Sequence, residues 1–142
     1  MTTAAVCTRP CVAGASGPDL TLSTDHVAGI SAMRRRLIET LRVRGCAEPT
    51  VDTAALLATE LLSNALKHAD VGGEPFPVRL DAYWNACGLT ILVTDPDPRL
   101  PVASDTDDDA ENGRGLGLLQ ALATRWGACH VADGKAVWCQ IA

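Results

Sequence analysis

Two polar side chains, Glu60 and Asn64, stand four residues apart within a strongly apolar stretch of the chain. In an α-helix, residues at this spacing differ by only about 40° around the axis, so both side chains share one face. A glutamate carboxylate accepts protons, and an asparagine carbonyl oxygen is a hard ligand that suits Mg²⁺. The spacing therefore allows a general base beside a metal ligand, although the same pair also occurs on solvated helix faces.

A glycine-rich segment, residues 113–118, is the second candidate for chemistry, and it directly precedes an apolar stretch. Glycine lets backbone N–H groups approach a ligand closely, and the first turn of a helix carries a partial positive charge. Together these features form a phosphate site, where Arg114 could reach a terminal phosphate. The same glycines could instead cap a helix or form a hinge, and their spacing fits neither a Walker loop nor a dinucleotide fingerprint.

A third polar group, Asp95, ends a strand-like apolar run and is followed by Pro96-Asp97-Pro98. Proline removes a backbone donor, so this sequence ends the strand abruptly. The next stretch, residues 100–112, shows no periodicity and carries five carboxylates, which predicts a solvated loop.

The elements that must position these groups follow from the apolar spacing. Helices are predicted from Thr24 or Asp25 to about Arg44, from Pro49 to Ala69, and from the glycine-rich segment to about Arg125. Alternating patterns predict five strands, at residues 20–23, 78–84, 89–94, 128–132 and 136–141, and a tight turn at residues 133–135 joins the last two. Paired helices beside meandering strands predict an α+β fold, a two-layer sandwich with a mixed, mainly antiparallel sheet covered by helices on one face.

Composition narrows the class of protein. The chain has 142 residues, of which 47% are hydrophobic, which predicts a flexible N-terminal arm (1–19) followed by one globular domain (20–142). The net charge of −5 argues against a nucleic-acid surface. We see neither an apolar run of the roughly 20 residues that span a bilayer nor a secretory signal, so we expect a cytoplasmic protein.

Six cysteines are scattered along the sequence. A chain with an ample core and no signal peptide favours reduced, mostly buried thiols over a disulfide framework. Cys7 and Cys11 are spaced loosely like half of a zinc site, but a second pair at suitable spacing is missing.

In this order, the three polar features resemble the Bergerat-type (GHKL) ATP-binding domains, and most closely the actinobacterial anti-sigma-factor serine/threonine kinases with a histidine-kinase-like ATPase fold. Residues 60–69 match the N-box of that family, Asp95 stands at the G1-box aspartate, and residues 113–118 match the G2 box. Residues 126–127 and 134–138 resemble the closing hairpin. The resemblance extends over residues 20–142.

The resemblance implies a role for each polar group. Glu60 would be the general base and Asn64 the Mg²⁺ ligand, while Asp95 would accept a hydrogen bond from the adenine amino group. Lys67 and His68 belong to the same N-box and would line the nucleotide site, although Lys67 also fits a surface position and His68 a locally bonded helix end.

The glycine-rich segment would hold the phosphates of ATP through the backbone of Gly113, Gly115, Leu116 and Gly117. Arg114 would approach the γ-phosphate as a second catalytic side chain, and residues 97–112 would form a lid over the nucleotide.

The same resemblance implies ATP and Mg²⁺ as cofactors and two protein partners, a sigma factor and an anti-anti-sigma protein of the STAS type. It also implies a homodimer, while the charge and the lack of a long apolar run lead us to expect no binding to nucleic acid or membrane. One departure stands out, because the family's Asp-x-Gly-x-Gly reads Asp-Pro-Asp-Pro-Arg at residues 95–99. The adenine pocket must then have another shape, and a regulatory binding module without kinase activity stays open as an alternative.

Overall fold

The computed structural model describes residues 9–12, 16–68, 77–85, 88–97, 117–132 and 134–141. In chain order, its named elements are β1 (Leu20–Thr24), the 3₁₀ turn η1 (Val27–Gly29), α1 (Ile30–Val43), α2 (Glu48–His68), β2 (Val78–Asn85), β3 (Gly88–Asp95), β4 (Arg125–Val131) and β5 (Gly134–Ile141). Residues 117–122 are also helical, and the chain is already a strand at Arg125, where a helix end was predicted.

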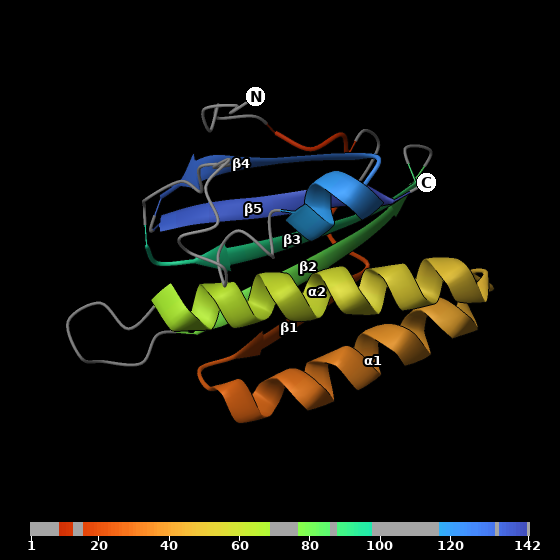
Figure 1. Cartoon of the computed structure of the whole chain (residues 1–142), viewed down its shortest axis with the longest axis horizontal. Helices are drawn as coiled ribbons and strands as arrows, with labels where there is room; N and C mark the ends of the chain where they lie inside the picture. The colour runs from red at the N-terminus through yellow and green to blue at the C-terminus, as the bar shows by residue number, and fades with distance from the viewer. Residues whose placement is uncertain are drawn as a thin grey trace.

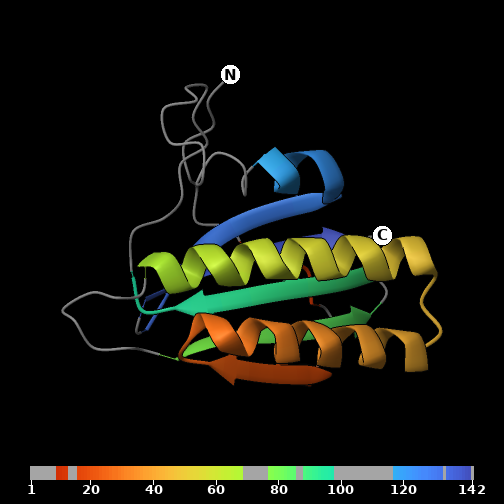
Figure 2. The same cartoon turned by 60° about the horizontal axis from the view of Figure 1, so that its bottom comes forward.

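The five strands form one sheet in the order β1-β2-β3-β5-β4, and α1 and α2 lie side by side on one of its faces (Figures 1 and 2). This arrangement confirms the α+β two-layer sandwich. The described strands pair only in antiparallel fashion, so the expectation of a mixed sheet was wrong. Helices α1 and α2 are antiparallel to each other, so they return the chain to the end of the sheet where β1 ended (Figure 1). β2 therefore starts beside the end of β1 and runs in the opposite direction.

Helix α1 is amphipathic and buries Ile30, Met33, Leu37 and Leu41 at spacings of three and four residues. It begins later than predicted, because the Thr24 hydroxyl bonds locally to the backbone of His26 (3.0 and 3.3 Å) instead of capping a helix. It ends as predicted at Gly45, whose φ of 80° suits a residue without a side chain.

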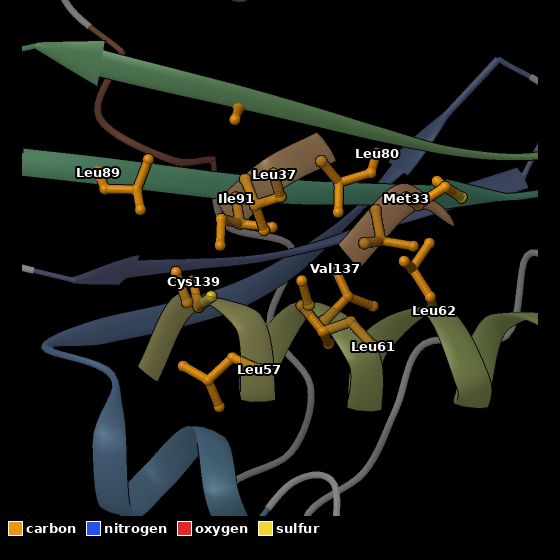
Figure 3. Close-up of a cluster of buried hydrophobic side chains, with 14 of the residues drawn as sticks. Met33, Leu37, Leu57, Leu61, Leu62, Leu80, Leu89, Ile91, Val137 and Cys139 are labelled. Atoms are coloured by element: carbon orange, nitrogen blue, oxygen red, sulfur yellow. The ribbon is translucent and has the colours of Figure 1, made fainter. Parts of the chain in front are cut away.

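The core lies between the helices and the sheet (Figure 3). It combines side chains from α1, α2, β2, β3 and β5, among them Met33, Leu37, Leu57, Leu61, Leu62, Leu80, Leu89, Ile91, Val137 and Cys139. Each large apolar side chain that is buried here contributes about 1.5–3 kcal/mol to folding. This packing fixes α2 against the sheet, and with it the polar side chains that α2 carries. No helix in the described part of the chain is long and apolar enough to cross a bilayer.

The other face of the sheet carries polar side chains that are nevertheless buried. Gln140 of β5 donates one hydrogen bond to the carbonyl oxygen of Cys11 (2.9 Å) and one to the hydroxyl of Thr90 on β3 (3.1 Å). Cys11 therefore contacts the sheet on the side away from the helices, because Gln140 lies on the opposite face from its neighbours Cys139 and Ile141 in the core. The flexibility predicted for the arm at residues 1–19 stays a prediction.

The cysteines do not all follow the expectation of reduced thiols. Cys11 is disulfide-bonded, so the expectation is wrong for this residue. Cys46, Cys129 and Cys139 form no disulfide, and burial raises the pKa of the Cys139 thiol to about 12. An adequate core removes the need for a framework of disulfides, but it does not prevent a single disulfide near the N-terminus.

Candidate functional site

Helix α2 places the first two candidate residues at the border between its packed face and solvent. Val51, Ala54, Leu57, Ala58 and Leu61 are buried, whereas Glu60 and Asn64 are half-buried and Lys67 is exposed. The helix is continuous from Glu48 to His68, so Glu60 and Asn64 share one face one turn apart. Half-burial sets the two residues apart from a fully solvated helix face.

The third candidate, Asp95, is the last residue of β3 and is only 3% exposed. One oxygen of its carboxylate, Oδ1, accepts two hydrogen bonds, from the backbone N–H of Asp97 (2.8 Å) and from Nζ of Lys135 (3.1 Å). The Lys135 ammonium also donates to the carbonyl oxygen of Asp97 (3.1 Å). Lys135 thus ties the carboxylate and the turn that follows it into one network.

Cross-strand pairing explains why these two charges meet. β3 and β5 are antiparallel neighbours in which Asp95 lies directly opposite Lys135, so their side chains point to the same face. That face also carries Ile91, Val93 and Val137 of the core, so it is the face covered by the helices.

Two opposing effects act on the pKa of the Asp95 carboxyl. Burial raises the pKa of the Asp95 carboxyl above its ordinary value, and the Lys135 ammonium and the Asp97 N–H offset part of that rise. The side chains of Lys135 and Asp95 are 10% and 2% exposed, so water screens this ion pair only weakly.

Gly134 allows this close packing. A Cβ atom at this position would overlap the carbonyl oxygen of Asp95 and would lie 2.6 Å from Cα of Pro96. The sequence predicted a tight turn at residues 133–135, but Gly134 and Lys135 already belong to β5. The missing side chain therefore serves the approach of two strands rather than the turn alone.

The two halves of the candidate site lie at the same end of the molecule. α2 packs against β3, and both elements run toward the same end (Figures 1 and 2). Asn64 is in the last turns of α2 and Asp95 is the last residue of β3. The fold therefore brings the metal-ligand candidate and the buried carboxylate toward one region.

Several candidate residues fall partly or wholly outside the described part of the chain. Gly113, Arg114, Gly115 and Leu116 lie outside it, as does the lid predicted at residues 97–112 except for Asp97. The same holds for the side chain of His68. Gly117 is described, is exposed, and would accommodate a Cβ atom without contact.

Lys135 is the residue that sequence reasoning missed. It was placed in a turn, where a lysine is usually solvated, and the sequence pattern alone did not give the register of β3 and β5. A positive residue opposite Asp95 becomes visible as a partner only once that register is known.

Comparison with known proteins agrees with this architecture. A family model described as a histidine kinase-like ATPase domain matches residues 24–141. An uncharacterized protein of Streptomyces coelicolor is 43% identical to the chain over 87 residues, which are 58% of this chain and 78% of that protein.

Proposed function

The chain belongs to the family of histidine kinase-like ATPase domains, a membership that implies ATP binding, and on this premise we propose that it is a regulatory serine/threonine kinase and anti-sigma factor. The observation that carries the proposal is the half-buried pair Glu60 and Asn64 on α2, near the end of the molecule where Asp95 closes β3. In this proposal, Glu60 serves as the base, Asn64 as the metal ligand and Asp95 as the acceptor for the nucleobase.

Each residue has a defined task in this proposal. The hydroxyl oxygen of a serine or threonine on a partner attacks the γ-phosphorus, the bond to the β-phosphate oxygen breaks, and ADP leaves. Glu60 takes the hydroxyl proton, and Asp95 accepts a hydrogen bond from the adenine amino group. In this proposal, the backbone of residues 113–117 would hold the phosphates and Arg114 would approach the γ-phosphate, while Lys67 and His68 would line the site.

Mg²⁺ fits the donor set of α2. Among the described residues there is no cluster of three acidic, histidine or cysteine side chains that would form a complete protein cage for a metal. Mg²⁺ commonly takes one or two protein oxygens and completes its shell with phosphate oxygens and water, which suits Asn64. When bound, the ion neutralises charge on the phosphates.

The partners in this proposal are a sigma factor, which the protein sequesters, and a STAS-type anti-anti-sigma protein, which it phosphorylates. We place the protein in the cytoplasm as a homodimer that contacts neither nucleic acid nor membrane. Sedimentation velocity across the micromolar range would reveal the dimer, and a monomer at every concentration would contradict it.

A second candidate function, a binding module without kinase activity, is favoured by one observation at Asp95. Its side chain is 2% exposed and one of its oxygens is already paired with Lys135, which limits the access of a nucleobase to it. Calorimetric titration with ADP and Mg²⁺ separates the two functions. Binding at micromolar to submillimolar nucleotide supports the ATP site, and absence of binding at millimolar nucleotide leaves the module.

The catalytic role of Glu60 is tested by transfer of labelled phosphate from ATP to purified STAS-domain proteins of the source organism. Glu60→Gln keeps the size of the side chain but removes the base, so transfer falls by about 10²–10⁴-fold while ADP binding persists. Asp52→Asn is the matched control, since Asp52 is an exposed carboxylate on the same helix. Equal transfer by Glu60→Gln and the wild type would refute the assignment of the base.

A further inference from the structure

We propose that Lys135 is a specificity-determining residue of the nucleotide site, because it occupies one oxygen of Asp95 and leaves a single carboxylate oxygen to read the base. The inference rests on the proposed ATP site. It deepens that site by naming how adenine is preferred over guanine. Both hydrogen bonds that described residues donate to the Asp95 carboxylate go to Oδ1, from Asp97 N–H and from Lys135 Nζ.

The Asp95 carboxylate can accept only a limited number of hydrogen bonds. An ionised carboxylate accepts about two hydrogen bonds at each oxygen. Oδ1 of Asp95 already receives two, so the remaining capacity belongs to Oδ2. The second bond of Lys135, to the carbonyl oxygen of Asp97, fixes the ammonium from two sides and prevents the carboxylate from exchanging its oxygens freely.

Adenine and guanine present different hydrogen-bond donors to a carboxylate. The hydrogen-bonding edge of adenine offers one exocyclic amino group beside a ring acceptor, whereas guanine offers a ring N–H and an amino group side by side. Two adjacent donors match a carboxylate only when both oxygens are available, as in bidentate pairing with arginine. With Oδ1 occupied, one guanine donor stays unpaired in a buried site, which disfavours guanine.

The backbone of the turn after β3 is also held by Lys135. Pro96 lacks an N–H group, so the turn after β3 offers one donor fewer than other residues would supply. Lys135 reaches across from β5 to bond both ends of that turn, at Asp95 and at Asp97. Gly134 permits this reach, because any larger residue would meet the backbone of Asp95 and Pro96. The turn that replaces the family's glycine-containing box is thus held by a side chain from the neighbouring strand.

Calorimetric titration of the full chain with ADP and with GDP tests the inference. The wild type should bind ADP at least about tenfold more tightly than GDP, which is the cost of one unpaired buried donor. In Lys135→Met, Oδ1 regains a free acceptor position, so the preference should shrink to about threefold or less. Arg125→Met removes an exposed positive charge from β4 and should keep the wild-type preference.

A second variant keeps the test decisive if Lys135→Met does not fold. In Asp95→Asn, the donors Lys135 and Asp97 N–H can only face the amide oxygen, which turns the amide NH₂ toward the base. This NH₂ group pairs with the 6-oxo group of inosine diphosphate and opposes the amino group of ADP. Asp95→Asn should therefore bind inosine diphosphate more tightly than ADP, the reverse of the wild type.

The outcomes separate this inference from the proposed function. Wild-type protein that binds ADP but does not prefer it to GDP would overturn the inference alone, as would a preference unchanged in Lys135→Met. Asp95→Asn that still favours ADP would also overturn it. Wild-type protein that binds neither nucleotide would overturn the inference together with the ATP site itself.

Discussion

Asp95 carries a negative charge into a region where burial disfavours it. Its pKa is raised above the ordinary value of 3.8, although Lys135 and the Asp97 N–H act in the opposite direction. A buried ion pair of this kind adds little to stability as a whole, but removing one partner leaves an uncompensated charge and costs about 3–5 kcal/mol. The network is therefore better explained by the position it gives to the carboxylate than by the stability it supplies.

The raised pKa of Asp95 predicts a specific dependence of stability on pH. Between 3.8 and the raised value, the folded protein holds a proton that the unfolded chain has already lost, so this carboxyl favours folding at low pH and opposes it as pH rises. Urea denaturation of the wild type and of Asp95→Asn between about pH 4 and about pH 8 measures the effect. The wild type should lose free energy of unfolding relative to Asp95→Asn as pH rises through this window.

The unfolding free energies of the wild type and Asp95→Asn must be compared, because other carboxyls titrate in the same pH range. Glu48, bonded to Arg42, has a lowered pKa and acts with the opposite sign, but it is present in both proteins and cancels. A difference in unfolding free energy that stays constant with pH would show that Asp95 titrates alike in the folded and unfolded states.

At the scale of single residues, the sequence predicted what a helix alone can arrange. The shared face of Glu60 and Asn64 follows from their spacing, and the position of Asp95 at a strand end follows from the prolines after it. The partner of Asp95 did not follow, since Lys135 is 40 residues away along the chain and depends on strand register.

The elements show where local pattern was sufficient. α2 was expected at residues 49–69 and lies at Glu48–His68, because its apolar spacing agrees with its burial along the whole length. The start of α1 was expected at Thr24 or Asp25 and lies at Ile30. Thr24 is an adequate cap by type, but its hydroxyl bonds to His26 instead, so a competing local hydrogen bond decided the boundary.

Gly134 is the position at which two elements depend on one missing side chain. Gly134→Ala would bring a Cβ atom into the backbone of Asp95 and Pro96, at a φ of 156° that also disfavours a side chain. We expect a loss of about 2 kcal/mol or more in the free energy of unfolding, measured by urea denaturation. Gly17→Ala is the matched control, because a Cβ at Gly17 meets no atom within 4 Å. Similar stability of both variants would mean that β5 can move away from Pro96 at little cost.

In the molecule as a whole, the two faces of the sheet differ, and the sequence pattern predicted only the apolar one. The face under α1 and α2 is the apolar core that the sequence pattern predicted. The other face buries Thr90 and Gln140 and is contacted by Cys11, 129 residues from Gln140 along the chain. A contact of that range leaves no periodic signal, and glutamine is normally read as a surface residue. Cys11 thus contacts the sheet, although the sequence pattern placed it in an N-terminal arm.

Gln140 links three parts of the molecule, so its replacement measures how firmly residues 9–12 are held to the sheet. Gln140→Leu keeps the volume of the side chain but removes the donor that serves Cys11 O and Thr90 Oγ1. Because Gln140 and Thr90 are buried and Cys11 is half-buried, we expect a loss of about 1–3 kcal/mol in the free energy of unfolding by urea. Gln120→Leu makes the same change at an exposed site and should stay within about 0.5 kcal/mol of the wild type. Equal stability of the two variants would show that the contact between the N-terminal segment and β5 holds no net free energy, and that the second face of the sheet is covered for reasons other than stability.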